Sequence, residues 1–207
     1  MPKLSTTSFA LLGLLGRRAW SAYELTKFMR HSILRAIWPR AESHLYSECK
    51  NLERAGYVDS TQKATGKRKR TEYVINASGK QALQEWMAQA AVNRFSIESE
   101  TLTKLVNAED AAQVHSLLKE FQQEARQDAA WTRQEVSRFL DGSQPVPAGR
   151  EYNAMVTALL GEMMECRLRW AQQMEARLKA EAQGDNAEER ALALYAEIEG
   201  NLGQLAR

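Results

Sequence analysis

Cysteine is scarce in this sequence, and its scarcity excludes two kinds of structure. The 207 residues contain 2 cysteines, Cys49 and Cys166, which lie far apart and form no CxxC pair. We therefore expect neither a disulfide framework nor a zinc site, and a reducing cytoplasm fits this usage. The histidines, His31, His44 and His115, share no metal-ligand spacing with the cysteines, so we expect no metal.

Long apolar runs are also missing. The longest run covers residues 9–16, whereas a membrane-spanning helix needs about 20 residues. Lys3 before the run is reminiscent of a signal peptide, but Arg17 and Arg18 follow directly, where a cleavage region is normally uncharged. We therefore interpret the run as a buried helix of a cytoplasmic protein that has no contact with a membrane.

Catalytic and cofactor motifs are absent as well. There is no Ser-His-Asp set, no paired-carboxylate arrangement and no glycine-rich phosphate loop; Gly66 and Lys67 lack the upstream glycine of a P-loop and do not begin a helix. The sequence therefore gives no reason to expect an enzyme, a catalytic residue or a cofactor. With only 4 prolines and 11 glycines, and with long stretches rich in Ala, Glu, Gln, Arg and Leu, the chain should be mainly helical.

What the chain does have is an uneven distribution of charge. Residues 1–92 hold 15 basic and 7 acidic side chains, a net charge of +8, whereas residues 93–207 hold 13 basic and 19 acidic ones, a net charge of −6. A basic half is typical of a domain that meets a polyanion. Chance clustering could give the same asymmetry, so charge alone does not decide the function. We expect two domains, one at 1–92 that could meet a polyanion such as DNA and a helical one at 93–207 that could serve for dimerisation.

Two helical patterns open the basic half. Apolar residues fill 5–15, with Gly16 as a plausible end. Ser21 and Glu24 form a capping box, which predicts that a second helix begins there and ends near His31.

A third helix is predicted over 40–54. Leu45, Cys49 and Leu52 recur at i, i+4 and i+7 and should face inward, and Gly56 should end the helix. The opposite face carries polar and basic side chains that could reach a duplex: Arg40, Ser43, His44, Tyr46, Ser47 and Lys50. Tyr46 could equally be a packing residue.

A two-stranded hairpin is predicted next, from alternating residues at 57–62 and 70–76. Gly66 should supply its turn, and its cations are Lys63, Lys67, Arg68, Lys69 and Arg70. Asn76 or Ser78 should then cap a fourth helix with Leu83 and Trp86 inside. Three helices, a basic hairpin and a helix make the order of a winged helix-turn-helix, in which a helix enters the major groove and the hairpin lies beside it. With Tyr23 and Lys27 of the second helix, the cations and the polar face form the expected DNA-binding set.

Longer helices are predicted over 111–140, 151–183 and 187–205, with a loop at 141–149 that contains two prolines and two glycines. Apolar side chains of the second of these helices are the expected dimer seam: Val156, Leu159, Leu160, Met163, Trp170 and Met174. Trp131 and Trp170 could instead line a pocket for a small-molecule effector, although tryptophans at helical spacing are more often core residues.

Three segments carry a resemblance to a known family: SAYEL, WPRAESHLYSECKNLERAGYV and TEYVINASGKQALQEWM. Over most of residues 5–90 the chain resembles the PadR family of bacterial transcriptional regulators, and residues 38–45 most resemble its Vir-like branch, which has a long helical C-terminal domain. The resemblance implies a homodimer on a pseudo-palindromic operator in double-stranded DNA, usually as a repressor. It departs from the family at Ala22, where glycine is usual, and at Cys49, where leucine is usual. The alternative is a helical protein-interaction scaffold with no DNA target.

Overall fold

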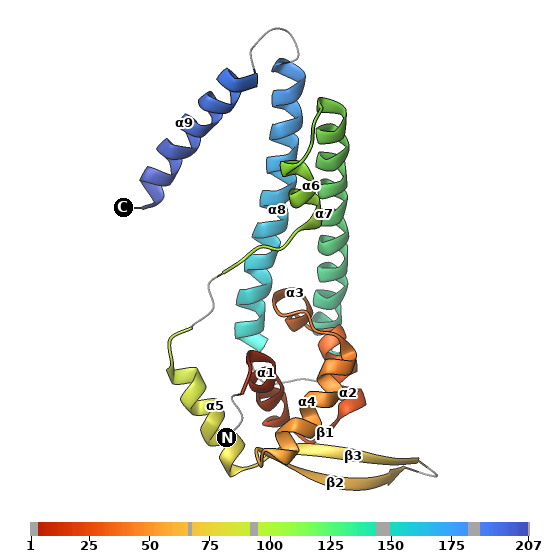
Figure 1. Ribbon diagram of the computed structural model, residues 1–207. Coiled ribbons are helices and arrows are strands. Elements are labelled where there is room, and N and C mark those ends of the chain that lie inside the picture. Colours follow the sequence, from red (N-terminus) through yellow and green to blue (C-terminus); the bar gives the residue numbers. More distant parts are fainter. Residues whose placement is uncertain (1–3, 66–67, 92–94, 144–149, 182–186, 207) are drawn as a thin grey trace. The chain divides into compact units, whose positions relative to one another are not determined.

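The computed structural model describes residues 4–65, 68–91, 95–143, 150–181 and 187–206. It is mainly helical with one small antiparallel sheet, which confirms the predicted fold class of a winged helix-turn-helix followed by helices (Figure 1). The chain forms two compact units, and each is described by itself. Unit 1 comprises residues 1–97 and 131–159, and unit 2 comprises residues 98–130 and 160–207. The division into domains at residue 92 stays a prediction.

Three helices of unit 1 follow the predicted patterns. Helix α1 (Thr6–Leu15) is capped by Ser5, and α2 (Ala22–Arg30) begins with the predicted capping box of Ser21 and Glu24. Helix α4 (Glu42–Arg54) begins two residues later than expected and ends before Gly56, whose positive φ of 78° suits glycine. A short α3 (Leu34–Ile37) lies between α2 and α4 and was not predicted, because a single turn is too short to show a periodic pattern.

The sheet has three strands rather than the expected two. Strands β2 (Val58–Thr65) and β3 (Arg68–Ile75) form a ribbon that extends beyond the helices of unit 1, and the two-residue β1 (Trp20–Ser21) pairs with the other edge of β3 (Figure 1). The strands also run further into the segment that was expected to be a loop, with Lys63 opposite Arg70 and Thr65 opposite Arg68. Gly66 and Lys67 lie outside the described residues.

Helix α5 (Ala77–Ala88) follows β3 and is capped by Asn76, one of the two predicted caps. Its first turn packs tightly against the sheet, because a Cβ built on Gly79 would lie 2.1 Å from the Tyr57 carbonyl oxygen. Further along, Trp86 stacks on Phe9 of α1 with ring centroids 4.8 Å apart. Helix α5 is thus fastened to both the sheet and α1.

A single cluster of buried apolar side chains forms the core of unit 1. It joins α1, β1, α2, α4, β2 and β3, and it includes the three residues predicted to face inward from α4, Leu45, Cys49 and Leu52. Burial raises the pKa of the Cys49 thiol to about 12, and the neighbouring Glu48 charge adds to the rise. The apolar sides of these helices and strands therefore pack against one another within unit 1.

Unit 2 contains α6 (Glu100–Val106), α9 (Ala187–Leu205) and parts of α7 (Ala111–Leu140) and α8 (Arg150–Glu181). The bounds of α7 and α9 are those expected, whereas α6 was not predicted. Its core is small: Leu118, Phe121 and Ala171 are buried, and the half-buried Trp170 meets Phe121 edge-on at 5.5 Å. Cys166 is exposed. Among the described residues no helix is long and apolar enough to cross a bilayer.

Candidate nucleic-acid interface

Helix α4 has one buried and one open side. Leu45, Cys49 and Leu52 are at most 3% exposed. The other side presents the polar set expected from the sequence: Ser43, His44, Tyr46, Ser47 and Lys50, all exposed. Tyr46 is 39% exposed, so its ring is partly packed and partly open. This open side has the width and polarity to enter a major groove.

The connection that leads into α4 is held by contacts that the sequence did not predict. The Trp38 indole N–H donates to the Thr7 hydroxyl of α1 at 3.0 Å, and the Arg40 guanidinium lies 4.1 Å from the centroid of the Trp38 ring. Arg30 of α2 forms an ion pair with Glu42 in the first turn of α4. The start of α4 is thus fixed to α1 and α2, and Arg40 stays exposed beside it.

A second fastening lies on the middle of α4. The Ser8 hydroxyl of α1 donates to the Glu48 carboxylate, which also accepts from the Asn51 amide at 3.1 Å. Glu48 is half-buried and faces α1 rather than the open side. The rotation of α4 about its axis is therefore fixed by a polar contact as well as by its apolar stripe. Glu48 gives no sequence signal, since its partner lies 40 positions away.

The cations of the interface fall into two groups. Lys27 of α2 and Lys50 of α4 are exposed and, within the described part of the chain, have no acidic partner. Tyr23 of α2 is 66% exposed on the same unit. Lys63 and Arg70, in contrast, are both paired with Glu72. The side chains of Arg68 and Lys69, and all of Lys67, lie outside the described residues.

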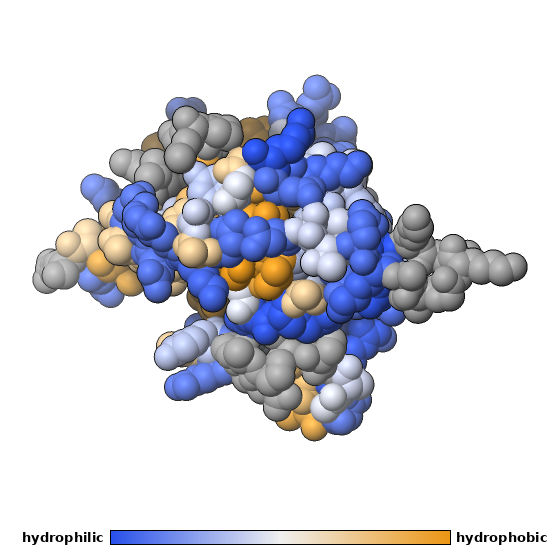
Figure 2. All heavy atoms as spheres, turned by 90° about the horizontal axis from the view of Figure 1, so that it is seen from below, coloured by the Kyte–Doolittle hydropathy of each residue, from blue (hydrophilic) through white to orange (hydrophobic). Residues whose placement is uncertain are grey.

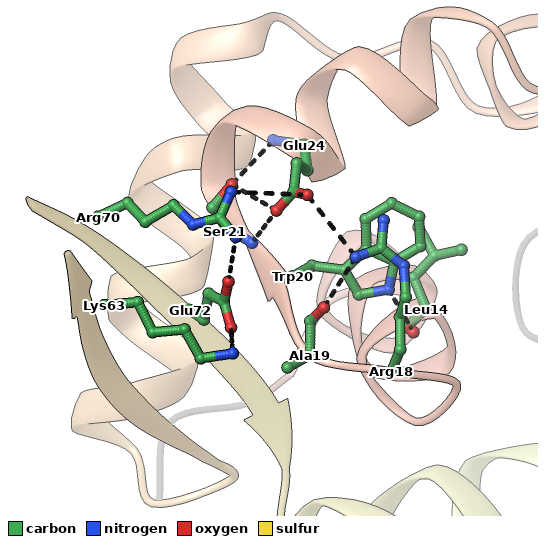
Figure 3. Close-up of polar contacts among 9 residues, drawn as sticks. All are labelled: Leu14, Arg18, Ala19, Trp20, Ser21, Glu24, Lys63, Arg70 and Glu72. Atoms are coloured by element: carbon green, nitrogen blue, oxygen red, sulfur yellow. Dashed lines mark hydrogen bonds and ion pairs between the residues drawn. The ribbon is translucent and has the colours of Figure 1, made fainter. Parts of the chain in front are cut away.

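A network of polar contacts surrounds Arg70 and Glu72 (Figure 3). Glu24 accepts from the Ser21 N–H at 2.9 Å and from its hydroxyl at 2.8 Å, and it lies 3.7 Å from Arg18 and 4.0 Å from Arg70. Burial raises the pKa of Glu24, but the bonds from Ser21 and the nearby arginines outweigh that effect, and its pKa lies below the ordinary value. The network links α2, β3 and the segment before β1.

The surface on the side of the β2–β3 ribbon is mainly polar (Figure 2). Seen from the side of the β2–β3 ribbon, it is mostly hydrophilic, with a small hydrophobic area near its centre (Figure 2). Such a surface can meet a phosphate backbone and base edges through polar side chains. Among the described residues, no cluster of His, Cys, Asp and Glu could hold a metal ion.

A pocket of about 440 Å³ lies beside the network in unit 1. Its lining combines cations with aromatic rings: Arg18, Trp20, Glu24, Lys27, Phe28, His31, Arg138 and Ser143. Arg138 of α7 donates to Glu135 at 2.9 Å, and His31 lies 3.2 Å from the same carboxylate. The Arg18 guanidinium lies 3.4 Å from the centroid of the Trp20 ring, so cations and aromatic rings are in direct contact in this lining.

The two tryptophans expected at an effector site belong to different units. Trp131 lies beside Arg35, with the guanidinium 5.0 Å from the ring centroid, and Trp170 packs on Phe121 of its own chain. Of the expected dimer residues, Trp170 and Met174 likewise pack in the core of unit 2. Leu159 is 54% exposed, and Val156, Leu160 and Met163 are half-buried. Neither set is tested by these contacts, and both stay predictions.

Comparisons with known proteins agree with this geometry. Residues 11–85 match the Transcriptional regulator PadR-like family. The fold is similar to Bacillus subtilis PadR, solved with operator DNA (18% identity, TM-score 0.71) and with p-coumaric acid (18% identity, TM-score 0.67); each match covers 84% of this chain and 99% of that chain. It is also similar to the Vibrio cholerae virulence activator AphA, with 18% identity, a TM-score of 0.63 and coverage of 84% of this chain and 99% of that chain.

Among curated proteins, no sequence match is found. The family match spans α4, the ribbon and most of α5, which are the elements that build the open polar surface. The predicted resemblance is confirmed at the level of the family, while the Vir-like branch stays a prediction. Through residues 11–85, which include α4, the ribbon and most of α5, the chain matches the PadR-like family of transcriptional regulators.

Proposed function

We propose that this chain is a sequence-specific regulator that binds duplex DNA as a homodimer. The observation that carries the proposal is the open side of α4, where Ser43, His44, Ser47 and Lys50 stand exposed opposite a fully buried stripe. A helix of this kind places short polar side chains at base edges while cations contact phosphate. Bacillus subtilis PadR, which has a similar fold, was solved with operator DNA.

Within this proposal each element has a distinct part. The α4 face, with Tyr46 at its edge, reads the bases. Arg40, Tyr23 and Lys27 contact the backbone beside it, and Lys67, Arg68 and Lys69 of the wing hold the neighbouring stretch. In a symmetric dimer two α4 helices would enter successive major grooves about 34–36 Å apart, so the operator should be pseudo-palindromic.

A selection of bound sites from random duplex DNA tests the proposal. Enriched half-sites one helical turn apart are the expected result. Replacing Ser43, His44 or Ser47 with Ala should relax the sequence preference, whereas replacing Lys67, Arg68 and Lys69 together should weaken binding to all sequences. Lys80→Ala is the matched control, because Lys80 is an exposed cation on α5, outside the proposed contacts.

The alternative of a protein-interaction scaffold makes the opposite prediction. A scaffold would bind no duplex even at low salt, and a selection from random DNA would enrich no sequence. Absence of binding at 50 mM salt, or a slope of log affinity against log salt near zero, would contradict the DNA-binding proposal, since each phosphate contact contributes a slope of about −0.9.

The dimer is proposed from apolar side chains left on the surface. Helix α9 exposes residues at spacings of three and four, a pattern typical of a helix that packs on another: Leu192, Tyr195, Ile198, Leu202 and Leu205. On α8, Leu159 and Met155 are more than half exposed. We propose that a second copy covers these residues together with Val156, Leu160 and Met163, while Trp170 and Met174 support α8 from within.

Repression is the proposed mode of regulation, because a dimer that occupies a promoter excludes polymerase. In-vitro transcription from a promoter that carries the recovered site should fall as protein is added. A rise in transcript would instead identify an activator.

A second proposal concerns an effector, and the cationic pocket of unit 1 favours it. Its two aromatic rings and several cations fit a planar carboxylate, and p-coumaric acid is the ligand in one Bacillus subtilis PadR structure. Titration of p-coumarate and related aromatic acids should quench tryptophan fluorescence, with Trp20 in the pocket wall as reporter.

Two variants distinguish binding of the acid in this pocket from non-specific binding elsewhere on the protein. Lys27→Met should lower the affinity at least about tenfold, because a charged hydrogen bond contributes about 1.5–3 kcal/mol. Lys80→Met should not change it. Equal affinities in both variants, or no response to any acid, would contradict this site and would leave Trp131 and Trp170 as the alternative location.

A further inference from the structure

Two cations of the ribbon stand directly opposite each other. Lys63 of β2 and Arg70 of β3 are partners in the antiparallel register. Opposed residues in such a pair have Cβ atoms about 4.5–5.5 Å apart, and like charges there repel. Something on the same face must offset this repulsion for the strands to remain paired.

Glu72 is the residue in a position to do so. It lies two residues beyond Arg70 on β3, and therefore on the same face, and diagonally across from Lys63. Its two oxygens are both used: Oε2 lies 2.7 Å from the Lys63 Nζ, and Oε1 accepts from the Arg70 guanidinium at 2.6 Å (Figure 3). Glu72 is only 7% exposed, whereas Lys63 and Arg70 are exposed.

The environment keeps this carboxylate charged. The hydrogen bond from Lys63 lowers the pKa of Glu72 below its ordinary value, and the charges of Lys63 and Arg70 lower it further against the opposing effect of burial. On its other side Glu72 is the register partner of Ser21, the cap of α2. Arg70 also lies 4.0 Å from Glu24, which that cap engages. The middle of the ribbon is thus tied to the start of α2 through alternating charges.

From these contacts we infer that Glu72 is a positioning residue for the wing, and that Lys63 and Arg70 hold the two strands of the wing together instead of contacting phosphate. This inference rests on the proposed DNA-binding function and refines it, since the sequence alone placed both cations in the DNA-contacting set. The phosphate contacts then fall to cations without an acidic partner in the described structure, such as Lys27 and Lys50, and to the wing tip.

The salt dependence of DNA binding separates a positioning cation from a contacting one. For the full-length protein on one fixed duplex, Lys50→Met should reduce the magnitude of the slope of log affinity against log salt by about 0.9 per protomer. Lys63→Met, which keeps the length of the side chain, should change the slope by less than about 0.3. Glu72→Gln keeps the shape but frees two cations, so it should steepen the slope and raise the affinity for random duplex several-fold.

A DNA-independent measurement tests the same inference on the free protein. In the wild-type background Lys63→Met should lower the Tm, because Glu72 loses a partner. In the Glu72→Gln background the same change should raise the Tm, because it removes one of two opposed cations. This reversal of sign is a property of the charge arrangement and not of the fold in general.

The outcomes are distinguishable. A slope reduced by about 0.9 in Lys63→Met, as in Lys50→Met, would overturn the inference, and so would a Tm that falls equally in both backgrounds. Failure of the wild-type protein to bind any duplex would overturn the proposed function instead, and the reversal of the Tm shift would still decide whether Glu72 organises the ribbon.

Discussion

Unit 1 buries a large cluster of apolar side chains drawn from six elements, whereas the buried cluster of unit 2 is small and its helix α9 leaves a regular row of apolar side chains exposed. Leu11, Leu12, Leu15 and Leu25 of unit 1 are fully buried, but Leu202 and Leu205 of unit 2 are 58% and 83% exposed. A domain that exposes a regular apolar helix face usually meets a partner. The difference agrees with the proposal that a second copy covers the exposed apolar side of α9.

The largest expected effect is on the assembly of unit 2. Tyr195→Glu combined with Leu202→Glu puts two charges on the exposed apolar side of α9, and burial of unpaired charge is strongly unfavourable. We expect the dissociation constant of the dimer to rise by at least about 100-fold, because two central apolar residues each contribute about 2 kcal/mol or more. Sedimentation equilibrium measures this change.

The control adds the same charge elsewhere on α9. Ala193→Glu combined with Gln204→Glu lies on the opposite side of the helix at exposed positions and should leave the dimer intact. If the control dissociated the protein as strongly as the test variant, net charge rather than the apolar face would explain the effect.

The next largest effect is expected in unit 1, where α5 meets the sheet. Gly79→Ala places a Cβ 2.1 Å from a backbone oxygen and 2.7 Å from Ile75, so the backbone must move. The free energy of unfolding should fall by about 3 kcal/mol, as for other overpacked sites. Gly13→Ala in α1, where a Cβ meets nothing within 4 Å, should instead raise it by about 0.5–1 kcal/mol. Guanidinium unfolding of both variants gives the comparison, and equal stabilities would refute it.

A smaller effect is expected from the cap of α2. Ser21→Ala removes the hydroxyl that accepts from the Glu24 N–H at 3.2 Å, and the free energy of unfolding should fall by about 1 kcal/mol. Ser78→Ala in the first turn of α5 is the control; Asn76 is the cap there, so the change should stay within about 0.5 kcal/mol. Thermal unfolding resolves the two, and a larger loss at Ser78 would contradict the observed cap.

The smallest effect is the response to acid. Glu24 and Glu72 have pKa values below their ordinary values, so the stability they contribute is present above the ordinary carboxyl pKa near 4.3 and is lost as the pH falls through their lowered values. In unit 2 the pKa of Glu100 is also lowered, chiefly by the hydrogen bond from Lys104, but Glu100 is 82% exposed and salt screens its pair. Hydrogen exchange from about pH 5 downward should show unit 1 loosening more than unit 2, and Glu24→Gln should reduce that difference; equal loosening would count against it.

The sequence predicted most of the fold because its signals are local. The capping box of Ser21 and Glu24, the inward stripe of α4 and the bounds of α7 and α9 all follow from residues a few positions apart. Strand β1 and helices α3 and α6 were missed because each has at most seven residues, too few to establish a period. The strands were predicted too short because the cations of the ribbon were assigned to a loop, although exposed long side chains are compatible with a paired strand.

The candidate site was less predictable because its support is not local. Glu48 meets Ser8, and Trp38 meets Thr7, across separations of 40 and 31 residues. The pairing of Arg70 with Glu72 did carry a signal, since alternate residues of a strand share a face. That signal was overlooked because the basic run was interpreted by its composition alone.

The two cysteines also differ between the units, with a practical consequence. Cys49 is buried and its thiol stays protonated at neutral pH, whereas Cys166 is the one exposed thiol of the chain. A nitroxide or a fluorophore can therefore be attached to Cys166 of the unmodified protein. Pulsed dipolar spectroscopy on such a sample would report the separation of two labels in a dimer, free and on DNA, without a single engineered residue.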